Sequence, residues 1–208
     1  MKRDDEFHVV DVPGGALPEV NRRWVSLIHE LPMAKPAYMC GDRKYLEWLY
    51  PEYGTSAEVE VMDFLYALVR LLKPDLIVEG GCYLGYGSYA LGRGAQDNGR
   101  GRVVTCDTDP DRCQQARIKV QSLPVEVRQC SILDVAELTQ CDLAFLDSGD
   151  DEKVSHDTRI GSLHKMKQGA LAVMHDTRNE KLLRPAVDAA GMPSIHFETW
   201  RGLSIIQC

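Results

Sequence analysis

The chain has 208 residues, of which 44% are hydrophobic and 26% charged, and its formal net charge is −7. This length and ordinary composition predict a globular protein with one main domain. The net acidity disfavours nucleic acid phosphates and anionic lipids as principal partners, and no apolar run approaches the roughly 20 residues of a membrane helix. We therefore expect neither a nucleic acid nor a membrane as partner.

The cysteines and the start of the chain indicate the cellular environment. All seven cysteines lie outside Cys-x-x-Cys pairs, and their odd number and apolar surroundings predict free thiols in a reducing compartment. The charged start, Met-Lys-Arg-Asp-Asp-Glu, leads into no apolar stretch, so a secretory signal is not expected. We expect a cytoplasmic protein.

Two parts of the chain differ in their residue pattern. Residues 1–55 are irregular and rich in proline and aromatic residues, with helices expected over 19–31 and 43–49. We interpret this part as an N-terminal helical cap, whose aromatic side chains could line a pocket or belong to the core. Regular periodicity begins near residue 56, which predicts a second domain over 56–208.

The second domain alternates helices and strands. Thr55-Ser-Ala-Glu58 is typical of a capping box ahead of a helix over 59–72, which Pro74 ends. After this helix we expect strands over 75–79, 102–106, 125–129, 142–147 and 169–174. Further helices are expected from the glycine-rich stretch to about Arg93, over 109–122 with Asp109 as cap, over 133–138, over 151–167, and over 180–190 with a kink at Pro185.

This alternation predicts an α/β fold. Five strand–helix repeats indicate a parallel sheet with helices on both faces. Residues 194–200 and 203–207 flank Arg201-Gly202 and indicate a closing hairpin. We therefore expect a Rossmann-like, doubly wound, seven-stranded sheet that is mostly parallel and ends in an antiparallel β-hairpin.

Polar residues follow all five predicted parallel strands, at the edge where open α/β sheets bind their ligands. These strand-end residues are Glu79 with the glycine-rich stretch, Asp107, Cys130-Ser131, Asp147 with Asp150, and His175-Asp176. The sequence therefore predicts that the functional site lies along this edge.

The glycine-rich stretch favours a particular kind of ligand. Its glycines at 80, 81, 85 and 87 lack the G-x-G-x-x-G spacing, and no Walker motif is present. Gly81 allows a sharp turn and Gly85 a close approach of a ligand. With Glu79 before it, the loop suits a cationic, amine-bearing ligand better than a pyrophosphate. Asp107 stands 22 residues after Gly85, where a carboxylate can accept both hydroxyls of a ribose.

The segment Glu79-Gly-Gly-Cys-Tyr-Leu-Gly-Tyr-Gly-Ser88 resembles the first motif of class I S-adenosylmethionine-dependent methyltransferases, in the small-molecule branch similar to catechol and sugar O-methyltransferases. The resemblance covers about residues 55–208 and implies S-adenosylmethionine as cofactor. Gly87 stands where this branch usually has Ser, and Ser88 is the expected substitute. The cofactor-binding residues that the resemblance implies are Glu79, Gly80, Gly81, Tyr83, Gly85 and Ser88 for the methionine part, Asp107 for the ribose, Ser131 and Ile132 for the adenine, and Asp147.

The same resemblance implies a site for Mg²⁺ or a similar divalent cation. Asp147 and Asp176 match two of the family's ligands, whereas Thr177 replaces an Asn, and His175 takes a position often held by Glu in the sugar O-methyltransferases. Hard oxygen ligands suit Mg²⁺, which would lower the pKa of an acceptor hydroxyl and orient it. The predicted metal ligands are Asp147, His175 and Asp176, and the predicted catalytic residues are His175, Asp150 and Asp147.

The sequence thus favours methyl transfer to a hydroxyl of a small phenolic or sugar-like molecule, and the resemblance alone implies a homodimer. One open alternative is a metal-independent methyltransferase with His175 as base, and another is a non-catalytic cofactor-binding module. The glycine spacing and the terminal hairpin disfavour a third, an NAD(P)-dependent Rossmann oxidoreductase. No Asn-Pro-Pro-Tyr motif follows the fourth strand, which disfavours nucleic acid methylation.

Overall fold

A seven-stranded sheet with the order β3-β2-β1-β4-β5-β7-β6 organises the chain. In this computed structural model the described residues are 57–149, 151–178, 181–199 and 201–208, so the predicted N-terminal cap and its two helices lie outside them. The strands are β1 (Leu76–Gly80), β2 (Arg102–Asp107), β3 (Val125–Gln129), β4 (Leu143–Leu146), β5 (Leu171–His175), β6 (Ser194–Phe197) and β7 (Leu203–Gln207). Strands β1 to β5 pair in parallel, and β7 runs antiparallel to β5 and β6. The predicted fold class is confirmed.

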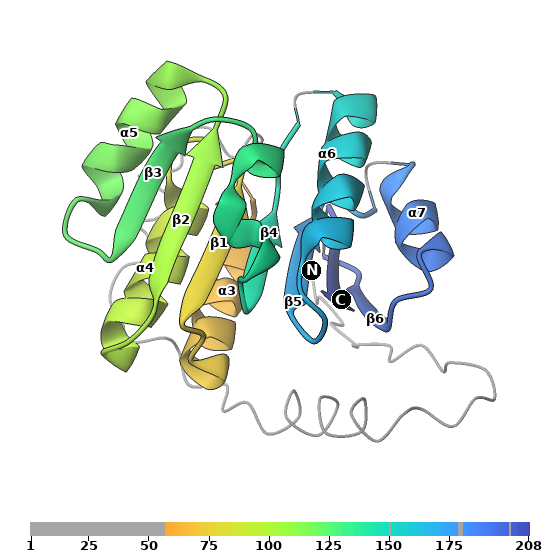
Figure 1. Cartoon of the computed structure of the whole chain (residues 1–208), viewed down its shortest axis with the longest axis horizontal. Coiled ribbons are helices and arrows are strands. Elements are labelled where there is room, and N and C mark those ends of the chain that lie inside the picture. The colour runs from red at the N-terminus through yellow and green to blue at the C-terminus, as the bar shows by residue number, and fades with distance from the viewer. Residues whose placement is uncertain (1–56, 150, 179–180, 200) are drawn as a thin grey trace, which may run out of the picture. The chain divides into compact units, whose positions relative to one another are not determined.

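Helices cover both faces of the sheet, with α3 and α4 behind the strands and α6 in front of them (Figure 1). The helices are α3 (Val59–Leu72), α4 (Tyr86–Asn98), α5 (Pro110–Val120), α6 (Glu152–Lys165) and α7 (Leu183–Ala189). The expected helix over 133–138 is a pair of 3₁₀ turns, Ile132–Asp134 and Ala136–Thr139. Asp109 caps α5 as predicted, because its side chain accepts hydrogen bonds from the first-turn backbone N–H groups of Asp111 and Arg112.

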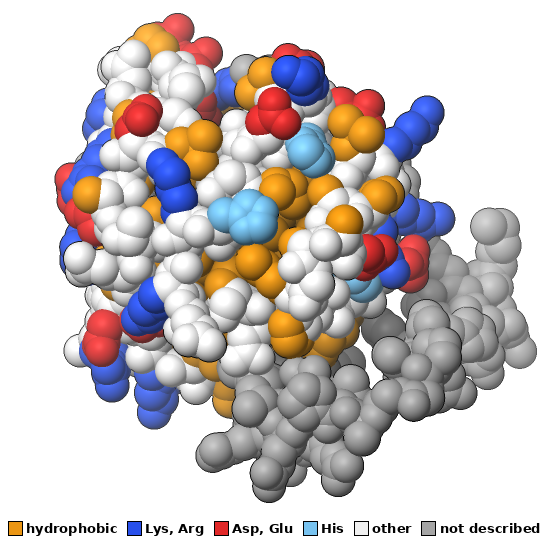
Figure 2. Space-filling model, turned by 45° about the vertical axis from the view of Figure 1, so that its right-hand side comes forward, with side chains coloured by type: hydrophobic (Ala, Val, Ile, Leu, Met, Phe, Trp, Pro, Cys, Tyr) orange, Lys and Arg blue, Asp and Glu red, His pale blue; other side chains and the backbone are white. Residues whose placement is uncertain are grey.

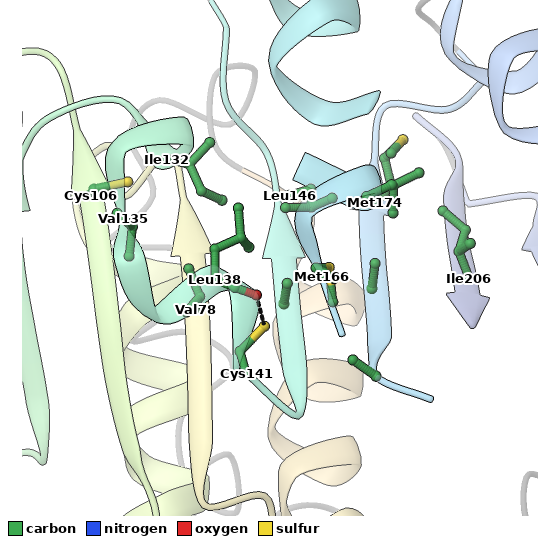
Figure 3. Close-up of a cluster of buried hydrophobic side chains, with 14 of the residues drawn as sticks. Val78, Cys106, Ile132, Val135, Leu138, Cys141, Leu146, Met166, Met174 and Ile206 are labelled. Atoms are coloured by element: carbon green, nitrogen blue, oxygen red, sulfur yellow. Dashed lines mark hydrogen bonds between the residues drawn. The ribbon is translucent and has the colours of Figure 1, made fainter. Parts of the chain in front are cut away.

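A large apolar cluster of the described residues lies between one face of the sheet and the elements that cover it, namely the 3₁₀ turns, α6 and α7 (Figure 3). Alternate strand residues point into this layer, among them Val78, Val104, Ala144, Leu146, Ala172 and Met174. Because successive side chains of a strand point to opposite faces, the residues next to these point the other way, toward α3 and α4. Glu79 and Thr105 therefore lie together on the opposite face.

The first described helix begins later than its capping signal indicates. Glu58 is the N-cap residue of α3 and has an extended backbone (φ −64°, ψ 155°), so it is not in the helix. Its carboxylate contacts the His175 ring and the backbone N–H of Arg201 and makes no cap hydrogen bond. The capping-box prediction is wrong for Glu58, because its side chain pairs with groups of distant segments.

Helix α4 continues to Asn98, beyond the predicted end at Arg93. Gly92 and Gly94 lie inside the helix, where a Cβ at Gly94 would come within 2.8 Å of the Val69 side chain and one at Gly92 would meet Val125. These glycines let α4 approach α3 and the start of β3 closely.

The predicted kink at Pro185 is also wrong. Helix α7 begins at Leu183, so Pro185 lies in its first turn, where the missing backbone N–H breaks no helical hydrogen bond.

The described surface carries charges of both signs. On the face in Figure 2 they surround a central area of apolar side chains and histidines. The large hydrophobic residues most exposed among those described are Ile118, Val154 and Leu182. Within the described ranges, no helix is long and apolar enough to cross a membrane. The six cysteines in this part of the chain are free thiols.

We expect Leu138→Ala to lower the free energy of unfolding by about 2–5 kcal/mol, since Leu138 is fully buried in the cluster of Figure 3 and the change leaves a cavity. Ile118→Ala, on the exposed side of α5, is the control and should change stability by about 0.5 kcal/mol or less. Urea unfolding measures both. Equal effects of the two substitutions would contradict the assigned core.

Candidate active site

A cavity of about 440 Å³ opens at the carboxyl ends of β1, β2, β3 and β4. The predicted site residues that line it are Glu79, Gly81, Tyr83, Asp107, Ser131, Ile132, Asp147 and Asp176. Four others do not form its wall, namely Gly80, Gly85, Ser88 and His175, and Asp150 lies outside the described residues. The structure therefore brings most of the predicted residues together along the expected edge.

The loop after β1 follows the ends of the neighbouring strands closely. The backbone N–H groups of Gly81 and Cys82 donate hydrogen bonds to the Cys106 carbonyl. Gly81 has a φ of 89°, and a Cβ there would collide with the Asp147 carbonyl. Gly85 has a φ of 82° and would place a Cβ 2.8 Å from Ala116 Cα. Glycine at these two positions therefore shapes the loop that borders the cavity.

Asp107 ends β2 beside this loop. One of its carboxylate oxygens accepts the Tyr83 backbone N–H at 3.0 Å, and the other accepts the Asp109 N–H at 3.0 Å. The Arg112 guanidinium lies 3.9 Å from Asp107 and packs over the Tyr83 ring. Each carboxylate oxygen has two lone pairs, so Asp107 can still accept hydroxyl donors from the cavity.

Glu79 is a buried carboxylic group at the floor of the cavity. The hydroxyls of Ser88 and Thr105 both donate to it, the latter at 2.5 Å. Burial raises the pKa of Glu79 to about 7, although these two hydrogen bonds oppose the shift. A Cβ at Gly87 would collide with the Glu79 carboxylate, so this position has room only for glycine. Ser88 is fully buried and supports Glu79 from behind.

Asp147, His175 and Asp176 form a cluster at the ends of β4 and β5, as the sequence indicated. Their potential ligand atoms all lie within 4.8 Å of one another. The His175 ring is 0% exposed, and its Nδ1 lies 3.2 Å from Asp147 Oδ1. Its Nε2 lies 2.5 Å from Glu58 Oε2, so the imidazole is held between two carboxylates.

Two arginines, neither of them anticipated, complete the cluster. Arg159 of α6 is 1% exposed and contacts both Asp147 and Asp176 through Nη2. Arg201, in the turn between β6 and β7, holds both carboxylate oxygens of Asp176, at 2.6 and 2.8 Å. Neither arginine carries a sequence signal that separates it from surface arginines, and Glu58 was taken for a helix cap. Only the tertiary structure brings these three residues to the cluster.

The charges of the cluster perturb its titration. Burial alone would lower the pKa of His175, but the Asp147 and Glu58 carboxylates outweigh it and raise this pKa to about 10. Burial would raise the pKa of Asp147 and of Glu58, but both are lowered because the His175 charge dominates, with help from Arg159 at Asp147. Burial and the Asp147 charge raise the pKa of Asp176, which the two arginines oppose.

The residues of this cluster do not fit a bound divalent cation. Both ring nitrogens of His175 already face carboxylates, Nδ1 at 3.2 Å from Asp147 and Nε2 at 2.5 Å from Glu58, so neither is directed at an open position. Two guanidinium groups already pair with the Asp147 and Asp176 carboxylates. Arg159 Nη2 lies 3.2 Å from Asp147 and 3.7 Å from Asp176, and Arg201 pairs with Asp176.

Comparison with known proteins identifies the domain type. Residues 78–177 match the family model described as a methyltransferase domain. No curated protein sequence matches the chain.

Several solved structures share the fold. PaMTH1, a methyltransferase of Podospora anserina with bound S-adenosylhomocysteine, has a TM-score of 0.65 and 16% identity, covering 93% of this chain and 98% of its own. The O-methyltransferase TomG of Streptomyces achromogenes, solved with S-adenosylmethionine, has a TM-score of 0.61 and 19% identity, with coverage of 89% and 97%. An O-methyltransferase of Bacillus cereus has a TM-score of 0.60 and 19% identity, with coverage of 91% and 90%. At these identities the likeness shows the shared fold.

Glu79 should make stability depend on pH. Its proton is bound more tightly in the folded protein than at its ordinary pKa of 4.5, so stability falls as pH rises from about 4.5 through about 7. The loss corresponds to about 3 kcal/mol. We expect Glu79→Gln to lose less stability than the wild type between about pH 5 and about pH 8 in urea unfolding.

The matched control is Glu60→Gln, which removes an exposed carboxylate from α3 and should keep the wild-type profile. Parallel pH profiles for Glu79→Gln and the wild type would show that Glu79 does not titrate in this range.

Proposed function

We propose that the chain is a class I S-adenosylmethionine-dependent methyltransferase that methylates a hydroxyl group of a small molecule without a bound metal ion. The match of residues 78–177 to a methyltransferase domain supports this proposal. The observation that carries the proposal is one cavity with a ribose acceptor, Asp107, at one side and an ionised carboxylate, Asp147, at the other. Phenolic and sugar hydroxyls are the acceptors that we propose from the sequence.

The cofactor half of the cavity provides groups suited to each part of S-adenosylmethionine. Asp107 can accept the two ribose hydroxyls, with Ser131 and Ile132 lining the adenine side. Tyr83 and Gly81 border the path toward Glu79, whose carboxylic group is suited to the cationic amino group of the methionine part. A cation bound there would favour the ionised form of Glu79 and so offset the cost of its burial.

The acceptor half contains the side chains that can orient a hydroxyl. Asp147 lines the cavity with Ser148, whose buried hydroxyl has no partner among the described residues. We assign Asp147 as the acceptor of the hydrogen bond from the substrate hydroxyl. S-adenosylmethionine bound in the cofactor half would supply the methyl group to this oxygen and would be released as the neutral thioether S-adenosylhomocysteine. The hydroxyl proton passes along the hydrogen bond to Asp147 and then to water.

His175 acts in this scheme as a positioning residue. Its ring is buried and does not form the cavity wall, and Glu58 and Asp147 engage its two nitrogens. It therefore holds Asp147 in place and keeps that carboxylate ionised, and it does not take the proton from the acceptor itself. A neutral carboxyl at Asp147 could not serve as the proton acceptor.

Cofactor binding tests the first half of the proposal. We expect the wild type to bind S-adenosylhomocysteine in isothermal titration calorimetry and Asp107→Asn to bind it about 10- to 100-fold more weakly, because one charged acceptor of hydroxyl donors is lost. Asp111→Asn, in the exposed first turn of α5, should bind like the wild type. If the wild type does not bind S-adenosylhomocysteine at about millimolar concentration, the proposal is wrong.

Turnover tests the second half. In an assay of methyl transfer from labelled S-adenosylmethionine to a panel of phenols and sugars, we expect Asp147→Asn to lower kcat about 10²- to 10⁴-fold by removing the proton acceptor. Its affinity for S-adenosylhomocysteine should remain near that of the wild type. If the wild type binds cofactor yet methylates nothing in the panel, or if Asp147→Asn keeps full turnover, the assigned role of Asp147 is wrong.

A further inference from the structure

We infer, building on the function proposed above, that the guanidinium of Arg159 takes the place of a divalent cation between Asp147 and Asp176, and that removing this side chain uncovers a cation site. The three candidate ligands Asp147, His175 and Asp176 lie together, but a side chain of the same chain already fills the space between the two aspartates. The cluster therefore carries a built-in cation.

Backbone acceptors fix the Arg159 guanidinium in this place. Its Nε donates to the Ser148 carbonyl at 2.9 Å, and its Nη1 donates to the His175 carbonyl at 2.6 Å. These carbonyls belong to the segments that also carry the two aspartates. The remaining nitrogen, Nη2, then lies 3.2 Å from Asp147 Oδ1 and 3.7 Å from Asp176 Oδ2. A planar group held by two carbonyls has little freedom to move away.

A metal ion and this guanidinium would compete for the same two carboxylate oxygens. Mg²⁺ binds oxygen ligands at about 2.0–2.1 Å. An ion that bridges Asp147 Oδ1 and Asp176 Oδ2 would lie close to Nη2, which contacts the same two oxygens, and the two positive charges would repel each other. To make room, Arg159 would have to give up its hydrogen bonds to the Ser148 and His175 carbonyls.

The charges of the cluster lead to the same result. Arg159 and Arg201 supply two permanent positive charges against the two negative charges of Asp147 and Asp176. Arg201 Nη2 donates to Asp176 Oδ2 and Arg201 Nε lies 2.6 Å from Oδ1, so a second positive charge faces that carboxylate. A divalent ion would add two positive charges to a group that is balanced without it.

Removal of Arg159 reverses this balance. In Arg159→Ala the two aspartates keep one arginine between them, and the space that Nη2 occupied becomes available next to their oxygens. Hard carboxylate oxygens in such a space favour Mg²⁺ or Mn²⁺. The variant should therefore gain a property that the wild type lacks, which a merely structural role of Arg159 would not produce.

Binding of Mn²⁺ to the full chain, measured by electron paramagnetic resonance after treatment with EDTA and desalting, tests the inference. We expect no saturable Mn²⁺ binding by the wild type, and one Mn²⁺ per chain in Arg159→Ala, at least about 10-fold tighter than any wild-type binding. Adding Asp147→Asn to Arg159→Ala should abolish the gained site. Arg178→Ala, which removes an exposed arginine paired with Glu198, should gain none.

Three results would overturn the inference. They are stoichiometric Mn²⁺ binding by the wild type that Asp147→Asn abolishes, wild-type turnover that requires added Mg²⁺, and a folded Arg159→Ala that binds no Mn²⁺. Should Arg159→Ala fail to fold, Arg159→Gln keeps most of the side-chain volume while removing the charge, and the wild-type measurements stand regardless. If the wild type does not bind S-adenosylhomocysteine, the proposed function is refuted. The Mn²⁺ measurements test only the role of Arg159 in the cluster.

Discussion

The pairing of two strand-end aspartates with two arginines is the interaction on which the site depends. Asp147 and Asp176 lie side by side because β4 and β5 are parallel neighbours, and two carboxylates so close together require positive charge nearby. Arg159 and Arg201 supply it from α6 and from the hairpin turn. Burying any of these charges alone would be costly, so the four side chains together link the ends of β4 and β5, helix α6 and the hairpin turn.

The same cluster connects the sheet to the start of α3. His175, at the end of β5, contacts Glu58 on one side and Asp147 on the other, while Glu58 also accepts the Arg201 backbone N–H. A change of charge at any of these residues should therefore alter the position or the pKa of Asp147 in the cavity wall. On the opposite side of the cavity, Glu79 is held by two hydroxyls only, and its pKa near neutrality leaves it able to respond to a cationic ligand. The two sides of the cavity thus differ in their electrostatics. Opposite charges balance each other around Asp147, whereas Glu79 has a pKa near neutrality.

Much of this could be predicted from the sequence because local signals and topology agree. The strand–helix alternation predicted the sheet, and Arg201-Gly202 between two strand-like segments predicted the hairpin. The tendency of open α/β sheets to bind ligands at the carboxyl ends of their strands predicted that Asp107, Asp147 and Asp176 lie at the site. Arg159 could not be predicted, because its importance arises from burial against groups that follow β4 and β5 and no periodicity records it. Glu58 was misassigned since its capping pattern is local, whereas its actual partner is 117 residues away. The predicted end of α4 at Arg93 was too early, since the helix continues to Asn98 with Gly92 and Gly94 in close contact with neighbouring elements.

We propose that this site catalyses methyl transfer with an arginine in the position of a metal ion. A crystal structure of the chain grown with S-adenosylhomocysteine and Mn²⁺, with anomalous data collected for manganese, tests it most directly. We expect the ligand's ribose at Asp107, Arg159 between Asp147 and Asp176, and no anomalous peak at these carboxylates. A manganese peak bound to Asp147 and Asp176, with Arg159 displaced, would contradict it.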